Sequence, residues 1–191
     1  MCHHPWTVSA GQTRRAGDLR KRLAALDAER ERLQAELLAL GPGEPLPGMH
    51  LAVEVAGRRA LLPASRVLEV VPLVPFSPLP RAVPHASGAF VYRGRPAVAL
   101  DLGSLAGTPR APDLDAHLVV MSSARPFALL VDRVRPLAQP PVVAPGDADA
   151  GDSWRGSPLV AALCRCGDEV LPLLATSALE RALAAEPVYL A

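Results

Sequence analysis

The chain has 191 residues, enough for one domain or two small ones. Half of the residues are hydrophobic but only 4% are aromatic, so any core is built from aliphatic side chains. The formal net charge of +1 gives no electrostatic reason to expect binding to nucleic acid or to an acidic membrane surface. Pro occurs 21 times, and because each Pro removes a backbone donor, short strands and turns are favoured over long helices.

The N-terminal region is predicted to contain one helix. Residues 1–17 are expected to be disordered, and residues 18–40 are predicted to be helical, with Asp18 as the N-cap and a Gly-Pro-Gly stop. Leucines recur there at alternating spacings of four and three, a narrow stripe typical of a coiled-coil seam. The dimerisation residues predicted from this stripe are Leu19, Leu23, Leu26, Leu33, Leu37 and Leu40.

The partner of this helix stays open at this stage. In a parallel homodimer Arg22 faces Asp27 of the second copy, which is an attractive pair. Arg30 interrupts the leucine seam and weakens it. The same stripe also suits packing on another protein or on the chain's own domain, since three heptads are marginal alone.

Beyond the helix, the pattern changes from helical to extended. Residues 41–49, rich in Pro and Gly, are predicted to be a linker. From residue 50 onward, short apolar runs alternate with turn residues, which predicts about ten short strands and a closing helix. This spacing suits a mainly β domain over residues 50–185, made of two small barrels at about 50–105 and 115–175.

Known chemical motifs are not found in the sequence. Phosphate-binding, dinucleotide-binding and hydrolase signatures are missing, so an enzyme is not expected. The three cysteines make no disulfide framework, and Cys164 and Cys166 lack zinc-ribbon spacing with Cys2. Neither a metal nor a cofactor is therefore expected. No apolar run approaches the roughly 18 residues of a membrane span, and residues 1–10 do not form a secretory signal, so we expect a cytoplasmic protein.

An ordered set of short motifs runs through residues 50–183. Its members are Arg58–Pro63, Val67–Val71, Pro84 with Gly88, Val91–Leu102 including Arg93-Gly94, Leu129–Val134, Gly156 and Val170–Leu174. In order and spacing this set resembles the CheW-like domain, the coupling protein of bacterial chemotaxis arrays. Each motif alone is weak, but the ordered set is specific.

The resemblance implies both a fold and a function. It implies two five-stranded SH3-like β-barrels without catalysis, and an adaptor that joins a histidine kinase of the CheA type to the cytoplasmic tip of chemoreceptors in membrane arrays. On this basis the kinase contact is expected at Val67, Glu69 and Gly88, and the receptor contact at Arg93, Gly94, Val131, Asp132 and Leu137. A second hypothesis is a structural oligomeriser that uses the coiled coil and no longer couples a kinase, since the helix is not part of the common domain.

Overall fold

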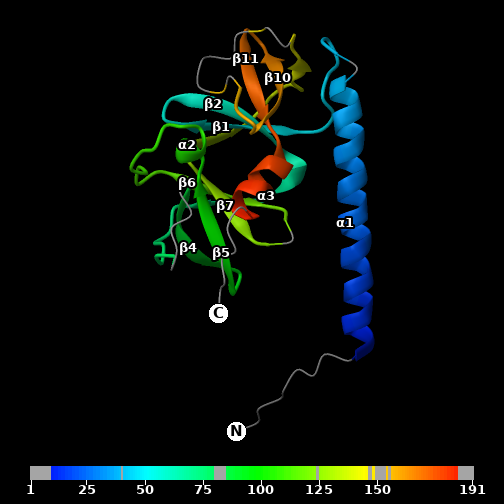
Figure 1. Ribbon diagram of the computed structural model, residues 1–191, viewed down its shortest axis with the longest axis vertical. Coiled ribbons are helices and arrows are strands. Elements are labelled where there is room, and N and C mark those ends of the chain that lie inside the picture. Colours follow the sequence, from blue (N-terminus) through cyan, green and yellow to red (C-terminus); the bar gives the residue numbers. More distant parts are fainter. Residues whose placement is uncertain are drawn as a thin grey trace. The chain divides into compact units, whose positions relative to one another are not determined.

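The structure, a computed structural model, describes residues 10–39, 41–79, 85–123, 125–145, 148, 154 and 156–184. The chain divides into two units, one at residues 1–40 and the other at residues 41–191 (Figure 1). The first unit contains helix α1 (Ala10–Ala39), and the second is a β-rich domain. Among the described residues, no helix combines the length and the apolar composition that crossing a membrane requires.

Helix α1 begins eight residues earlier than predicted, at Ala10 instead of Asp18. The expected disorder at residues 10–17 is therefore wrong, and Asp18 is not the N-cap. Residues 10–16 include Ala, Gln and Arg, which are good helix formers, and a Gly such as Gly17 inside a helix costs only about 1 kcal/mol relative to Ala. The described helix ends at Ala39, one residue before the predicted end. Leu40 and residues 1–9 lie outside the described residues.

The second unit is mainly β, as predicted. Its helical segments are η1 (Ala64–Arg66), α2 (Leu102–Leu105) and α3 (Thr176–Ala184). Its strands are β1 (His50–Val55), β2 (Arg58–Pro63), β3 (Val67–Pro72), β4 (Ala86–Tyr92), β5 (Arg95–Asp101), β6 (His117–Met121), β7 (Phe127–Val131), β8 (Arg133–Pro136), β9 (Val142–Val143), β10 (Val160–Cys166) and β11 (Glu169–Leu174).

The strands form two mixed sheets, one of six strands in the order β8-β1-β2-β11-β10-β9 and one of five in the order β3-β6-β7-β5-β4. Strands β1 and β2 therefore belong to the six-stranded sheet, β3 to β7 form the five-stranded sheet, and β8 to β11 belong to the six-stranded sheet again. This corrects the predicted division at about 50–105 and 115–175. The first hairpin joins the last one through the parallel pair of Leu61 with Leu173, a long-range contact that local patterns do not reveal.

The five-stranded sheet curls until its two edge strands meet. Ser77, just after β3, exchanges two backbone hydrogen bonds with Ala89 of β4, at 2.7 and 2.8 Å. Phe76 packs edge-on against Phe90, with the ring centres 6.4 Å apart. This closure makes the sheet a small barrel and leaves no long open edge for unwanted pairing.

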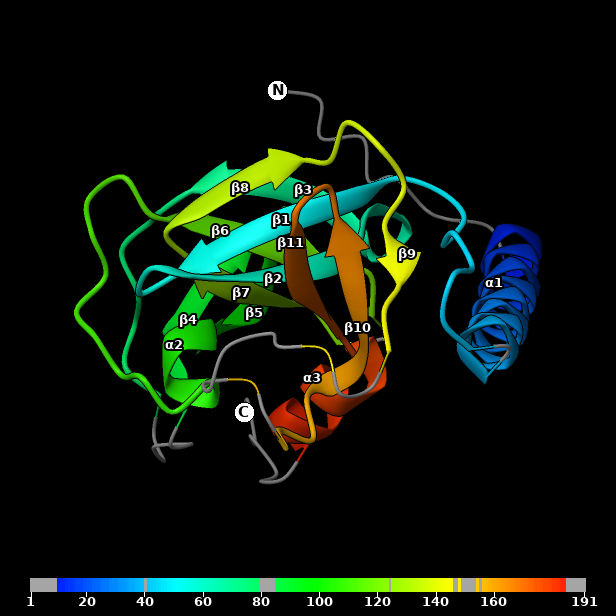
Figure 2. The same cartoon turned by 90° about the horizontal axis from the view of Figure 1, so that it is seen from above.

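The central strands of this barrel are buried on both faces. One face of β5, β6 and β7 packs against the six-stranded sheet and α3, while the other face fills the barrel interior. Figure 2 shows β1 and β2 lying beside β6 and β7. Double burial explains why residues 118–121 and 127–131 are continuous apolar runs without polar alternation.

Residues 41–49 belong to the domain and do not form the predicted free linker. Leu46 is only 1% exposed. The amide of Gly43 donates to the carbonyl of Val143 at 3.0 Å, and the amide of Leu46 donates to the carbonyl of Pro141 at 2.8 Å. The edge near β9 offers free backbone groups, and an extended Pro-containing segment can pair with such an edge.

Candidate functional site

A cluster of three polar side chains marks one end of the five-stranded sheet. Arg93 and Gly94 form the turn between β4 and β5, with φ of 49° and 74°, as a two-residue hairpin turn requires. The Arg93 guanidinium donates to Oε2 of Glu69 at 2.9 Å, and the Tyr92 hydroxyl donates to the same oxygen at 2.8 Å. We call Glu69, Tyr92 and Arg93 the hairpin cluster.

The electrostatics of the hairpin cluster favour an ionised Glu69. The hydrogen bond from Tyr92 holds the pKa of Glu69 below its ordinary value; partial desolvation opposes this shift and Arg93 adds to it. The same hydrogen bond raises the pKa of the Tyr92 hydroxyl. Arg93 also lies over the Tyr92 ring, 5.2 Å from its centre, at cation–π distance. The cluster therefore carries one positive and one negative charge, held together at the surface.

One predicted kinase residue and one predicted receptor residue thus meet in the hairpin cluster. Glu69 was assigned to the kinase surface and Arg93 to the receptor surface, but the two side chains form an ion pair. The Arg93 side chain is still 72% exposed, so a partner can reach it. Gly94 beside it is also exposed.

Three exposed apolar side chains are chain neighbours of the hairpin cluster on β3 and β4, and Val70 and Val91 alternate with Glu69 and Tyr92 and so face the outer side of these strands. Leu68 and Val70 on β3 are 58% and 38% exposed, and Val91 on β4 is 76% exposed. Val67 and Val71 instead pack against the two cores. The sequence prediction missed the exposed three, because the residues around Glu69 on β3 are all apolar and show no polar alternation that marks an outward face.

Gly88 does not offer the expected contact surface, because it is buried. A Cβ at this position would lie 2.7 Å from the Cβ of Phe76 and 2.8 Å from the carbonyl oxygen of Ser77, and φ is +151°. The absence of a side chain at Gly88 therefore allows the close approach that shuts the barrel. Its effect on a kinase contact would be indirect, through this closure.

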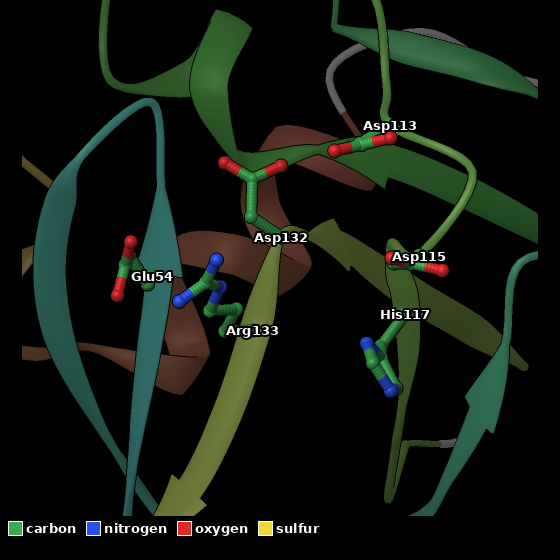
Figure 3. A pocket seen from close by; sticks show the side chains of 6 residues that line it. All are labelled: Glu54, Asp113, Asp115, His117, Asp132 and Arg133. Carbon is green, nitrogen blue, oxygen red and sulfur yellow. The ribbon is translucent and has the colours of Figure 1, made fainter.

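A second feature, a polar pocket of about 400 Å³, lies where the two sheets meet. Figure 3 shows its lining, which comes from β1, from β6 and the loop before it, and from the junction of β7 and β8. The lining residues are Glu54, Asp113, Asp115, His117, Asp132 and Arg133. Four carboxyl groups against one arginine make this pocket acidic.

Asp132 uses both carboxylate oxygens inside the chain. Oδ2 accepts a hydrogen bond from the amide of Ala56 at 2.7 Å, and Oδ1 pairs with the Arg110 guanidinium at 2.5 Å. Asp132 therefore ties the β1–β2 turn and the loop before β6 to the end of β7. Its neighbour Val131 is fully buried, and Leu137, just after β8, is half-buried.

The structure does not bring the predicted receptor residues together. β5 pairs in parallel with β7, with Val98 opposite Phe127 and Asp101 opposite Leu130. Arg93 precedes the start of β5, whereas Asp132 follows the far end of β7. At about 3.3 Å per residue, the length of β5 separates the two ends by roughly 20 Å. The hairpin cluster and the acidic pocket are therefore distinct surfaces.

The two described cysteines are free thiols. Cys164 is fully buried, and burial raises the pKa of its thiol to about 12; the pKa of Cys166 is raised as well, by partial burial. Within the part of the chain that the structure describes, no group of three or more His, Cys, Asp or Glu is arranged to hold a metal ion. The expectation of ordinary thiols stays a prediction.

The geometry agrees with comparisons to known proteins. A model of the CheW-like domain family matches residues 50–183. No curated protein matches the chain. Among solved structures, the scaffolding protein TtCheW from Thermoanaerobacter tengcongensis is similar with a TM-score of 0.54 at 20% identity, over 69% of this chain and 86% of that chain. This likeness concerns the fold, and the family match begins at His50, after helix α1.

Proposed function

We propose, from the premise that this chain belongs to the CheW-like domain family, that it is a noncatalytic adaptor that couples a chemoreceptor to a histidine kinase of the CheA type. Membership of the family supports a scaffold or adaptor role in chemosensory signalling. The observation that carries the finer proposal is the hairpin cluster with its exposed apolar neighbours. The proposal also implies recruitment to membrane receptor arrays.

The composition of this surface suits a protein partner. Tyr and Arg are enriched at protein interfaces, and both occur in the hairpin cluster. Leu68, Val70 and Val91 add exposed apolar area on the outer side of the same strands, β3 and β4, of the kind that marks interaction sites on otherwise polar surfaces. This end of β3 and β4 therefore offers a charged group that can pair with a partner and, on the outer side of the strands, an apolar contact.

We assign the kinase to the β3 side and the receptor to the hairpin side of this surface. On β3 we assign the exposed Leu68 and Val70, the chain neighbours of Glu69, as contact residues in place of the buried Gly88. On the hairpin, Arg93 can exchange its internal carboxylate for carboxylates of a receptor helix, with bidentate geometry. Val131 and Asp132 then act by supporting the fold, not by touching the receptor.

Charge reversal tests this assignment. Glu69→Arg is expected to weaken binding to purified kinase, and Arg93→Glu to weaken binding to a receptor-tip fragment by about 1–3 kcal/mol, as for loss of a charged hydrogen bond at an interface. Arg93→Lys should recover only part of the lost receptor affinity, since the planar guanidinium is gone. Calorimetric titration measures each affinity, and thermal unfolding should stay near that of the wild type.

Two further variants separate direct contact from damage to the cluster. The double variant Glu69→Arg with Arg93→Glu restores an internal ion pair in reversed polarity, so its binding should stay weak if partners touch these side chains directly. Arg135→Glu, on the exposed β8, changes the net charge by the same amount as Arg93→Glu and should leave both affinities unaltered. Wild-type affinities for both partners in both single variants would show that this surface is not used.

A second candidate function is a structural oligomeriser that no longer couples a kinase. The observation that favours it is the exposed leucine stripe of α1, with Leu23 and Leu26 61% and 67% exposed. Co-purification with a kinase of the CheA type separates the two functions. Recovery of the kinase with the wild-type chain supports the adaptor, and its absence from a stable oligomer supports the oligomeriser.

A further inference from the structure

The full extent of helix α1 adds one heptad to its seam. With leucines at positions a and d, the early start at Ala10 places Gln12 at d and Ala16 at a. Four leucines of the stripe are largely uncovered. The exposed fractions are 52% for Leu19, 61% for Leu23, 67% for Leu26 and 47% for Leu33.

The charged positions beside this seam are divided by sign along the helix. In the first half, the charged residues at e and g are all basic: Arg15, Arg20 and Arg22. In the second half they are all acidic: Asp27, Glu29 and Glu36. These positions set partner choice and orientation in coiled coils. The helix is therefore complementary to a second copy of itself running in the opposite direction.

A parallel arrangement is poorly matched. The pairing of g with the following e position gives the attractive pair Arg22 with Asp27, but the longer helix adds Arg15 facing Arg20 of the second copy, which repel each other. In a parallel register, equal a positions also meet, so the two Arg30 side chains share one layer of the seam. Both features favour another orientation.

An antiparallel arrangement removes both conflicts. Position a then faces position d of the second copy, and the register that sets Leu23 opposite Leu26 also sets Arg30 opposite Leu19. The Arg30 guanidinium already reaches aside to Oδ1 of Asp27, at 3.0 Å, which leaves its aliphatic stem for the seam. The basic half of each helix lies along the acidic half of the other.

We propose that α1 binds a second copy of this chain as an antiparallel coiled coil. At 1.5 Å per residue, the C-terminal ends of the two helices, from which the two domains continue, then lie about 40 Å apart at opposite ends of the coiled coil. A parallel coil would release both CheW-like domains at the same end. The antiparallel dimer is thus a spacer that links two separate domains. This inference does not depend on what the domain itself binds.

Spin-label distances in the full chain test the orientation. Single cysteines replace Lys21, Ala28 and Ala35, all on the outer face, in a background with Cys2→Ser and Cys166→Ser, and the buried Cys164 stays unlabelled. In the antiparallel register, the axial offset between the two labels is about 10 Å at positions 21 and 28 and about 30 Å at position 35. A dipolar distance clearly longest at position 35 is the expected result.

Two outcomes overturn the proposal. Equal distances at the three positions would show a parallel coiled coil. A monomeric mass by light scattering at the concentration used for labelling would show that the stripe binds another protein or its own domain. Both outcomes leave the kinase and receptor measurements untouched, so failure here is distinguishable from failure of the adaptor function.

Charge variants test the complementarity itself. Arg20→Glu with Arg22→Glu makes both halves acidic and should weaken self-association roughly tenfold or more at low salt. Adding Asp27→Arg and Glu29→Arg to that chain restores opposite halves in reversed polarity and should restore the dimer. Wild-type association of the first variant, or no recovery in the second, contradicts charge pairing between the halves.

Discussion

The two ends of the five-stranded sheet use charged residues in opposite ways. At the hairpin end, Arg93 has one partner carboxylate and remains 72% exposed. At the pocket end, Asp132 has only 22% of its side chain exposed and is bonded to both Ala56 and Arg110. Sequence motifs gave these two residues the same role. Their surroundings indicate that the first is available to a partner and the second holds the fold together.

The difference follows from what lies beside each end. The pocket end meets the six-stranded sheet, so its polar groups are partly desolvated and must find partners within the chain. The hairpin end projects beyond the barrel, where water satisfies polar groups and an ion pair contributes little to stability. A substitution should therefore change stability at the pocket end and binding at the hairpin end.

The largest expected effect comes from breaking the closure that holds the hairpin end. Gly88→Ala forces a Cβ against Phe76 and the backbone of Ser77, and should lower the free energy of unfolding by about 2–4 kcal/mol. Gly94→Ala is the matched control, because it has open space around it and only a left-handed φ, at a cost of about 1–2 kcal/mol. Urea denaturation measures both. Equal losses would argue against the close approach at Gly88.

The contrast between the two ends is tested directly by alanine substitution. Asp132→Ala leaves the amide of Ala56 and the guanidinium of Arg110 without their acceptor, and should cost about 2 kcal/mol of stability. Asp132→Asn keeps one acceptor and should cost less. Arg93→Ala should change stability by less than about 0.5 kcal/mol. A larger loss in Arg93→Ala than in Asp132→Ala would reverse the assignment of the two ends.

The six-stranded sheet should also respond to pH through His50, which is buried at the start of β1. Burial lowers the pKa of His50 below its ordinary value of 6.5, while a hydrogen bond to the carbonyl of Gly48 partly opposes this. The neutral form is thus favoured by folding. The contribution of His50 to the free energy of unfolding should be fully present above pH 6.5 and decline as the pH falls below it. Free energies of unfolding, measured for the wild type and His50→Gln across this pH range, check the prediction. Equal slopes of the unfolding free energy against pH in the two proteins would contradict it.

Much of the fold could be predicted because its signals are local. The apolar runs of residues 118–121 and 127–131 and the Arg93-Gly94 turn follow from side-chain character and turn geometry over a few residues. The division of the chain between the sheets could not be predicted, because the parallel pair of Leu61 with Leu173 joins residues 112 positions apart. The packing of Leu46 into the domain could not be predicted either, because a Pro-rich segment has the same composition whether or not it pairs with an edge strand.

Two residues of the hairpin cluster were candidates from the sequence, but their arrangement was not predicted. Family motifs identified Glu69 and Arg93, yet nothing in the sequence shows that a curled sheet brings β3 and β4 into contact. The burial of Gly88 and Val131 depends on neighbours far away in the chain. Leu68 and Val70 were missed because an apolar strand residue has the same character whether it faces the core or the solvent.

The smallest expected effect concerns the hydrogen bond within the hairpin cluster. Tyr92→Phe removes the donor that contributes most to the lowered pKa of Glu69, so this pKa should rise toward its ordinary value while Arg93 still holds it partly down. A lowered carboxyl pKa stabilises the fold above the ordinary pKa, and this contribution is lost as the pH falls through the folded value. Tyr92→Phe should therefore narrow the acidic range over which Glu69 stays charged, with little change in the melting temperature at neutral pH. Carboxyl chemical shifts of Glu69, followed by NMR during acid titration, measure the effect. An unchanged Glu69 titration in Tyr92→Phe would show that the Tyr92 hydroxyl and the carboxylate are not bonded in solution. Arg93 would then be held by the carboxylate alone, and the hairpin end would be still more open to a partner.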